Sequence, residues 1–287
     1  CHRHTAMPEP TTERFPPGHY YSALPDLQAV RENEARLFGP LPRTLPGIDM
    51  QEAAQQAVLE RFAGYYPDIP FTDQPSPGLR YHYQNPAYGY SDAIMLHCML
   101  RHLAPRRVVE VGSGHSSCVT LDTIEHFLDH PVHTTFIDPY PALLQSLMHP
   151  GDAARTTVLG LPLQDVPMEV FQALGENDVL FIDSTHVSKV GSDVNRLLFD
   201  IFPLLAPGVA IHLHDIFYPF EYPKAWILEG RAWNEAYLVR AFLQDNARFQ
   251  VLLMNTFMSH FHRGFFEQHM PLCLRNEGAS LWLRKTG

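Results

Sequence analysis

The sequence lacks several features that would place a chain of 287 residues in a specialised class. It contains no apolar run of 18 or more residues, so a membrane-spanning helix is not expected. Its four cysteines form no CxxC pair, which argues against a disulfide framework and a zinc knuckle. Lys and Arg number 21 against 31 Asp and Glu, and no basic block stands out. We therefore expect a soluble, cytoplasmic protein that binds neither membrane nor nucleic acid.

The N-terminal quarter of the chain is rich in proline, which disfavours helix interiors and central strands. The first ten residues, CHRHTAMPEP, have no apolar stretch of signal-peptide length, so we expect a tail outside the fold. Residues 1–80 are predicted to form a partly irregular arm with helices near 27–38 and 49–66. Residues 81–287 are predicted to form the main domain. If the chain forms a homo-oligomer, the arm is the expected contact surface.

From residue 91 onward, short β-branched runs alternate with helical patterns. Strands are expected at 107–111, 133–139, 156–160, 178–184, 208–215, 249–255 and 279–285. Helices are expected at 91–105, 116–130, 140–148, 166–174, 193–205 and 233–245, the first with Ser91 as its N-cap, while Asp49 caps the helix of the arm. This alternation predicts an α/β protein with a Rossmann-like, doubly wound, mostly parallel seven-stranded sheet covered on both faces.

Polar residues and glycines occur where the predicted strands end. Gly112, Asp138, Asp183, His214 and Asp215 stand at carboxyl ends, where sheets of this kind bind ligands. This placement is the first indication of an active site.

A glycine-containing turn, VVEVGSGHSS, follows the first core strand and includes Glu110, Gly112 and Gly114. Glycine is needed where the backbone turns sharply or approaches a ligand closely, although an ordinary tight turn is the alternative. The next strand ends at Asp138, an acid placed to accept both hydroxyls of a ribose. Together these features indicate a nucleoside ligand and leave open whether it is NAD or S-adenosylmethionine.

Five motifs in order, EVGSGHSS, FIDP, LPLQDV, FIDSTH and HLHD, give a more specific indication. Over about residues 80–287 the chain resembles the class I S-adenosylmethionine-dependent methyltransferases. Within that superfamily it resembles the metal-dependent O-methyltransferases of the catechol and macrolide sugar types. The resemblance implies that the last two strands form an antiparallel terminal hairpin.

The resemblance also implies roles for the cofactor-side residues. Glu110, Gly112 and Gly114 would line the methionine end of S-adenosylmethionine, and Asp138 would hold the ribose. Gln164 and Asp165 would lie near the adenine, with a solvated loop as the alternative.

Asp183, His214 and Asp215 are expected to converge if their two strands are neighbours. Two carboxylates so close repel each other, and a divalent cation would remove that conflict. The resemblance implies Mg²⁺ at these positions, but the related families usually carry an acid in place of His214. Imidazole suits Mn or another transition metal better than Mg²⁺, so the metal stays open. The alternative is a metal-free hydrogen bond between His214 and Asp215.

His186, three residues after Asp183, matches the D-x-x-H pattern of the macrolide sugar enzymes, which implies a general base. The alternative is a loop histidine bonded to backbone. His212 is expected in the core, and Asp193 as a helix N-cap. The aromatic stretch 216–233 is expected to cover the substrate or to pack on the arm. Residues 259–269 are expected to form a second loop that could reach the same site, and no role is assigned to it.

These observations predict a metal-assisted, S-adenosylmethionine-dependent O-methyltransferase that acts on a hydroxyl of a small molecule, such as a sugar or a phenol. Two alternatives stay open: an iron-dependent oxidative enzyme on the same fold, and a non-catalytic module that binds S-adenosylmethionine. The sequence identifies neither the methyl acceptor nor the oligomeric state.

Overall fold

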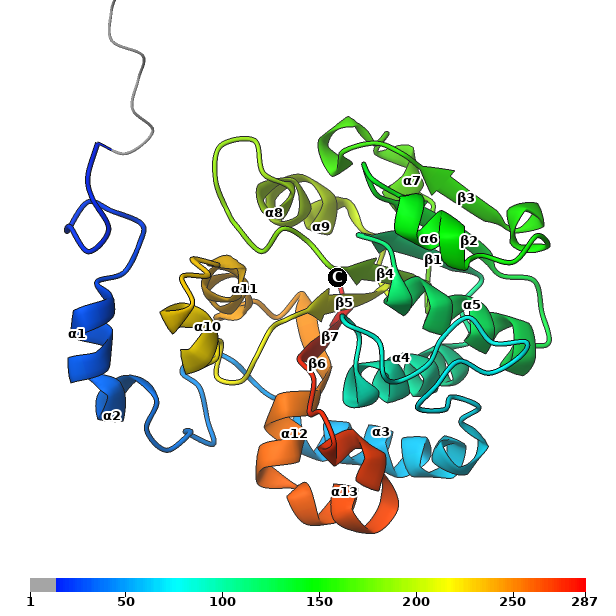
Figure 1. The fold of residues 1–287 in the computed structure, drawn as a ribbon, viewed down its shortest axis with the longest axis horizontal. Helices are drawn as coiled ribbons and strands as arrows, with labels where there is room; N and C mark the ends of the chain where they lie inside the picture. The colour runs from blue at the N-terminus through cyan, green and yellow to red at the C-terminus, as the bar shows by residue number, and fades with distance from the viewer. Residues whose placement is uncertain (1–13) are drawn as a thin grey trace, which may run out of the picture. The chain divides into compact units, whose positions relative to one another are not determined.

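A seven-stranded sheet organises residues 14–287, the part of the chain that this computed structural model describes (Figure 1). Its strands are β1 (Arg107–Val111), β2 (His133–Ile137), β3 (Thr156–Leu159), β4 (Val179–Ile182), β5 (Ala210–His214), β6 (Phe249–Met254) and β7 (Ser280–Lys285). Their order is β3-β2-β1-β4-β5-β7-β6. Strands β1 to β5 pair in parallel, whereas β7 pairs antiparallel with both β5 and β6, so the predicted fold class and the antiparallel terminal pair are confirmed. The tail CHRHTAMPEP lies outside the described residues.

The register of the parallel strands brings their carboxyl ends to one edge of the sheet. Val111 pairs with both Ile137 and Ile182, and Ile182 pairs with Leu213. The residues that follow these positions therefore emerge side by side. Every residue of β4 and β5 is buried, as expected for central strands with both faces covered.

Helices cover both faces of this sheet. Figure 1 shows α4 and α5 on one side and α8, α9 and α11 on the other. Residues 42–222 and 233–287 contain the helical elements α3 (Glu52–Tyr65), η1 (Tyr66–Asp68), α4 (Tyr90–Leu103), α5 (His115–Phe127), α6 (Ala142–Leu147), η2 (Asp152–Ala154), η3 (Leu163–Asp165), α7 (Glu169–Gln172), α8 (Asp193–Asn195), the π-helical η4 (Arg196–Ile201), α9 (Phe202–Leu204), α11 (Glu235–Leu243), α12 (Asn255–Phe261), α13 (Arg263–His269) and η5 (Pro271–Leu274).

Three local expectations from the sequence are wrong. Gln51 rather than Asp49 precedes α3, and the Asp49 carboxylate instead accepts the Gln51 backbone N–H. Ser91 lies inside α4, which begins after Gly89. Residues 259–269, expected as a loop, lie in α12 and α13, which meet at His262 and bury the side chains of Phe257, Met258 and Phe266.

A second, smaller unit consists of the described residues up to Leu41 together with Pro223–Ala232. It contains α1 (Leu27–Glu32), α2 (Glu34–Leu37) and α10 (Lys224–Leu228). Asp26 caps α1 by accepting the N–H groups of Gln28 and Ala29, and an ion pair joins Glu34 to Lys224. The larger unit spans Pro42–Tyr222 and Trp233–Gly287. The predicted boundary at residue 80 and the predicted oligomer contact stay predictions.

The helices of residues 14–287 include none that is long and apolar enough to cross a membrane.

Candidate active site

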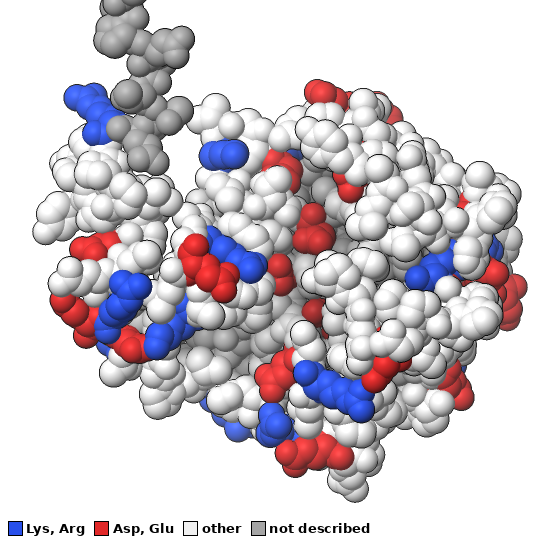
Figure 2. Space-filling model, viewed as in Figure 1, with Lys and Arg blue, Asp and Glu red and all other residues white. Residues whose placement is uncertain are grey.

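A cavity of about 330 Å³ opens at the carboxyl ends of β1, β2 and β4. Its lining residues are Val111, Gly112, Ile137, Asp138, Pro139, Pro162, Leu163, Gln164, Asp183, Ser184, Thr185 and Asp193. Four of the predicted site residues are among them: Gly112, Asp138, Gln164 and Asp183. Figure 2 shows acidic side chains in and around the hollow near the centre of this face. A carboxylate-lined cavity of this kind favours a ligand that carries positive charge and hydroxyl groups.

Gly112 allows the first turn to lie directly against the end of β4. Its φ angle is +77°, in the left-handed region, and a Cβ there would lie 2.3 Å from the Asp183 carbonyl oxygen. A side chain at position 112 would therefore push β1 and β4 apart at the floor of the cavity.

The Asp138 carboxylate is held in place by the glycine-containing turn. It accepts hydrogen bonds from the backbone N–H and the hydroxyl of Ser113, at 3.1 and 2.9 Å, and from the Tyr140 N–H at 2.7 Å. Fixed in this way beside the cavity, it is preorganised to accept hydrogen bonds from a ligand.

Glu110 does not line the cavity but is fully buried beneath the start of α5. Its Oε1 accepts hydrogen bonds from Ser116 and Ser117, at 2.6 and 2.8 Å, while Oε2 has no partner. Burial raises the pKa of the Glu110 carboxyl to about 8, and the two serine hydroxyls only partly oppose this rise. Gly114, the N-cap of α5, also lies outside the cavity lining.

This raised pKa makes the stability of the protein depend on pH. Between about pH 4.5 and 8 the folded chain keeps a proton on Glu110 that the unfolded chain has lost, so stability falls as pH rises. The slope from one such group is at most about 1.4 kcal/mol per pH unit. We expect Glu110→Gln to make the fall between pH 5.5 and 7.5 shallower, as measured by urea unfolding. Exposed Glu60→Gln is the control, and equal slopes in all three proteins would contradict the assignment.

The two adenine-side residues of the prediction separate in the structure. Gln164 lines the cavity, and its amide donates to the Gly191 carbonyl oxygen at 2.6 Å. Asp165 is exposed and is not part of the lining. Their proposed contact with adenine stays a prediction.

Four side chains, which we call the strand-end cluster, converge beside the cavity: Asp183, His186, His214 and Asp215. His186 Nε2 lies 3.3 Å from Asp183 Oδ1 and 3.7 Å from Asp215 Oδ2. His214 Nε2 lies 3.7 Å from Asp215 Oδ1. The side chain of Asp183 is 42% exposed, whereas that of His186 is 5% exposed. Asp183 therefore forms the accessible edge of the cluster, and the imidazole of His186 lies behind it.

The carboxylates around His186 decide its charge. Burial alone would lower the pKa of His186, but hydrogen bonds to Asp183 and Glu235 outweigh it and raise the pKa to about 10. Burial raises the pKa of Asp183 less than its contacts with His186 and His214 lower it. His186 is therefore an imidazolium at neutral pH, and its charge compensates the two aspartates.

The residues predicted to bind a metal ion do not form a ligand set in this structure. No group of three or more His, Cys, Asp or Glu side chains within residues 14–287 is arranged to hold an ion. The imidazole of His186 instead lies between the carboxylates of Asp183 and Asp215. The repulsion from which a cation was predicted is thus relieved by a side chain of the protein, and the metal stays a prediction.

Sequence reasoning missed Glu235, the first residue of α11. This carboxylate is buried, accepts a hydrogen bond from His186 Nδ1 at 2.8 Å and accepts another from the Ser184 hydroxyl at 2.9 Å. It lies 49 positions after His186, at a helix start where an acid is common for reasons of helix electrostatics alone. No local pattern in the sequence marks it as a functional residue.

His212 is a core residue, as predicted. It is fully buried, and its ring stacks on Phe181 with centroids 4.0 Å apart and also packs against Trp282. Neither ring nitrogen has a hydrogen-bond partner, and burial lowers the pKa of His212, so it is neutral. Its ring packing, rather than hydrogen bonding, accounts for its place in the core.

The remaining expectations near the site are modified. Asp193 is not a helix N-cap: Ser192 caps α8, and the Asp193 carboxylate accepts the N–H and hydroxyl of Thr185. In the aromatic stretch, Tyr218 and Phe220 are buried in the core, whereas Trp233 lies over His186 with ring centroids 4.3 Å apart. Only Trp233 of these three therefore reaches the strand-end cluster.

A second hollow, of about 410 Å³, is lined by residues of 47–51 and 243–251. It contains none of the strand-end residues.

Two comparisons with known proteins match a large part of this chain. Residues 109–216 match a family model described as a methyltransferase domain. An uncharacterized protein of Archaeoglobus fulgidus is 30% identical over 168 residues, which cover 57% of this chain and 75% of that protein.

Similar solved structures are more distant in sequence. The O-methyltransferase TomG of Streptomyces achromogenes, involved in tomaymycin synthesis and solved with SAM, is 15% identical over 90% of this chain and 96% of its own, with a TM-score of 0.45. An O-methyltransferase of Bacillus cereus with SAH is 12% identical over 91% and 100%, with a TM-score of 0.44.

The matched segment begins within β1 and ends just after Asp215, so it contains both the glycine-containing turn and the strand-end cluster. The family match, the relative and the strand order lead to one conclusion: the chain belongs to the class I S-adenosylmethionine-dependent methyltransferases.

Proposed function

We propose that this methyltransferase transfers the methyl group of S-adenosylmethionine to a hydroxyl of a small molecule, with His186 as the proton acceptor. The observation that carries the proposal is the position of the His186 imidazole, directly behind the accessible carboxylate of Asp183. A hydroxyl that attacks a methyl group must lose a proton, and a fixed imidazole is the usual acceptor. Gly112, Asp183 and His186 thus lie together at one edge of the sheet.

In the proposed cofactor site, Gly112 and Asp138 border the cavity, and Asp138 accepts the ribose hydroxyls. Gln164 also lines the cavity, and the adenine is proposed to bind beside it. Glu110 contributes from beneath, by fixing Ser116 and Ser117 at the start of α5. The cationic sulfonium would then lie in a cavity lined by carboxylates, which favours binding of the substrate over its neutral product.

The chemical step balances without a further reactant. The hydroxyl oxygen forms a bond to the methyl carbon, the carbon–sulfur bond breaks, and its electron pair stays on sulfur as S-adenosylhomocysteine. The hydroxyl proton passes to Nε2 of the neutral form of His186. Asp183, which borders the cavity and lies 3.3 Å from Nε2, orients the hydroxyl toward that nitrogen. Alignment of oxygen, carbon and sulfur provides the rest of the rate enhancement.

The proposal includes no metal ion, because His186 already compensates Asp183 and Asp215 and the described residues form no ligand set. Nor does any geometry within residues 14–287 favour the iron-dependent oxidative alternative.

Calorimetry with S-adenosylmethionine and S-adenosylhomocysteine tests the cofactor site. We expect both to bind, and Asp138→Ala to weaken binding roughly ten- to hundredfold, since a hydrogen bond to a charged group contributes about 1.5–3 kcal/mol. Asp129→Ala, a change at a fully exposed carboxylate, is the control and should leave affinity unchanged. The absence of binding of either compound at millimolar concentration would refute the cofactor site, provided that the melting curve shows a folded protein.

A further inference from the structure

The loop that carries His186 is held by the start of α11, a helix that no sequence motif connects with it. The His186 backbone has a φ of +58°, a left-handed conformation that needs support in a residue other than glycine. Its carbonyl oxygen accepts the N–H groups of Asn234 and Glu235, at 3.0 and 3.1 Å. Its own N–H donates to the Ser184 hydroxyl at 2.9 Å. The backbone of His186 is therefore fixed on both sides.

The side chain of His186 is fixed by the same helix start. Glu235 Oε2 lies 2.8 Å from Nδ1, and Oε1 accepts the hydroxyl proton of Ser184 at 2.9 Å. Trp233 packs against the imidazole with the two ring planes 35° apart. Because a carboxylate can only accept, Nδ1 must carry a proton. Nε2 is then the nitrogen that faces Asp183 and Asp215.

We propose that Glu235 is a positioning residue for methyl transfer: its carboxylate keeps the proton on Nδ1 of His186 and directs Nε2 toward the acceptor hydroxyl. This inference rests on the proposed function, because it assigns Glu235 to the base of that reaction. Glu235 itself is 2% exposed and lies behind the ring, so it acts through His186 and does not touch the substrate.

The second contact of Glu235 supports this role. Ser184 lines the cofactor cavity, and its hydroxyl donates to Glu235 while accepting the backbone N–H of His186. Asn234 adds two further hydrogen bonds, to the backbone N–H and carbonyl oxygen of Ser188. One helix turn thus orients the ring, supports the strained backbone and anchors the loop that borders the cofactor cavity.

The test uses the complete protein labelled with ¹⁵N-histidine, and it needs no acceptor molecule. We expect the wild-type spectrum to show a proton on Nδ1 of His186, strongly shifted downfield by the carboxylate, with His186→Ala used to assign the signal. Glu235→Gln should abolish that downfield signal. Glu229→Gln, the same change at an exposed glutamate six positions earlier, should leave it in place.

An Nδ1 of His186 without a proton in the wild-type protein would overturn the inference, even if Glu235→Gln failed to fold. An unchanged signal in folded Glu235→Gln would overturn it as well. The affinity of Glu235→Gln for S-adenosylhomocysteine should differ less than twofold from that of the wild type, because Glu235 does not line the proposed cofactor cavity. A different result would contradict the proposed function alone: the wild type shows the Nδ1 signal, but His186→Ala still transfers the methyl group.

Discussion

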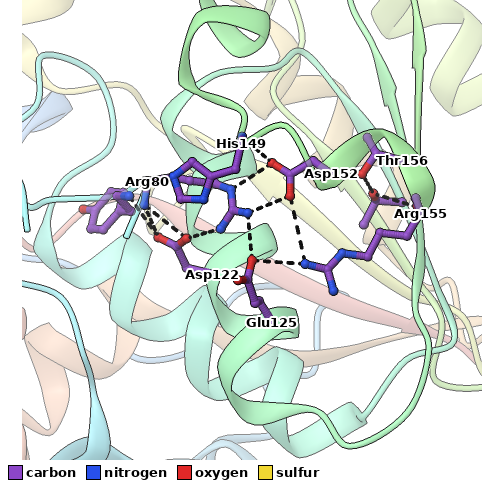
Figure 3. A network of polar contacts seen from close by, with 9 residues as sticks. Arg80, Asp122, Glu125, His149, Asp152, Arg155 and Thr156 are labelled. Carbon is purple, nitrogen blue, oxygen red and sulfur yellow. Dashed lines mark hydrogen bonds and ion pairs between the residues drawn. The ribbon is translucent and has the colours of Figure 1, made fainter. Parts of the chain in front are cut away.

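Arg80→Met should destabilise the protein by about 3–5 kcal/mol, the range found when one partner of a buried ion pair is removed. Figure 3 shows the Arg80 guanidinium directed at Asp122, Glu125 and Asp152. Its Nε and Nη2 bind both oxygens of Asp152, at 2.9 and 2.6 Å, and Nη1 binds Asp122 at 2.7 Å. The side chains of Asp122 and Asp152 are 0% and 1% exposed, so the variant removes the cation of Asp122 and leaves Asp152 with Arg155 alone, 4.0 Å away.

The backbone adds to this effect, because Asp122 also accepts the N–H groups of Arg80 and Tyr81. Loss of the guanidinium therefore weakens the attachment of residues 80–81 to α5. The segment that follows brings Tyr88 against the ring of His214, with centroids 5.2 Å apart. Arg80→Met should therefore also disturb the packing of Tyr88 against His214 in the strand-end cluster, in addition to lowering stability.

The midpoint of urea unfolding measures this prediction, with Arg263→Met as the control. Arg263 is 54% exposed and pairs with Glu267 on the surface, where an ion pair contributes about 0–1 kcal/mol. The loss from Arg80→Met should be larger at pH 8 than at pH 5, because at the lower pH the carboxylates of Asp122 and Asp152 can bind protons and become neutral. A destabilisation below about 1 kcal/mol at pH 8 would show that the network contributes little beyond a surface pair.

The strand ends were predictable from the sequence because parallel strands follow a simple rule. Each strand of a parallel sheet runs in the same direction, so an acid after one strand and an acid after its neighbour must emerge at one edge. The positions of Gly112, Asp138 and Asp183 could be predicted from this rule alone, and all three residues line the same cavity. The antiparallel pairing of β6 with β7 followed from the family resemblance rather than from the residues alone, and the order of the strands was not predicted.

Contacts between distant polar residues were not predictable. Arg80 lies in an irregular segment 42 positions before Asp122, and Glu235 lies 49 positions after His186. Hydrophobic periodicity shows which face of an element is buried, but a buried charge appears in it only as an interruption. For the same reason the sequence brought Asp183 and Asp215 together but did not show that the His186 ring lies between them, since the position of that ring depends on tertiary structure. The metal ion stays a prediction.

Helix ends were predicted less well, because the expected capping residues make other hydrogen bonds. Asp49 accepts the N–H of Gln51 before α3 begins, and Asp193 binds Thr185 across the loop. In both cases a carboxylate that could cap a helix accepts a backbone N–H in a turn or loop instead, and the sequence does not show which of the two hydrogen bonds forms.

His186→Ala should lower the rate constant of methyl transfer by about a hundred- to ten-thousandfold, the usual contribution of a general base. The affinity for S-adenosylhomocysteine should stay within about twofold of the wild type, since His186 does not line the cofactor cavity. Because hydrogen bonds to Asp183 and Glu235 raise the pKa of His186 to about 10, only a small neutral fraction accepts protons at pH 7. The wild-type rate should therefore increase about tenfold per pH unit from pH 7 toward pH 10, and the rate of the variant should lose this dependence.

The measurement is transfer of a labelled methyl group from S-adenosylmethionine to a panel of small phenols and sugars, with and without a chelator. His260→Ala, a change at an exposed histidine near the end of α12, is the control. If the variant at position 186 kept the wild-type rate, the proton acceptor would have to be another group, and Asp183, the accessible carboxylate of the cluster, would be the first to replace. If the chelator lowered the rate and His186→Ala did not, the result would instead support the metal-assisted reaction predicted from the sequence. Since the imidazolium of His186 and a divalent ion would compensate the same two carboxylates, these outcomes decide which cation the strand ends were built to hold.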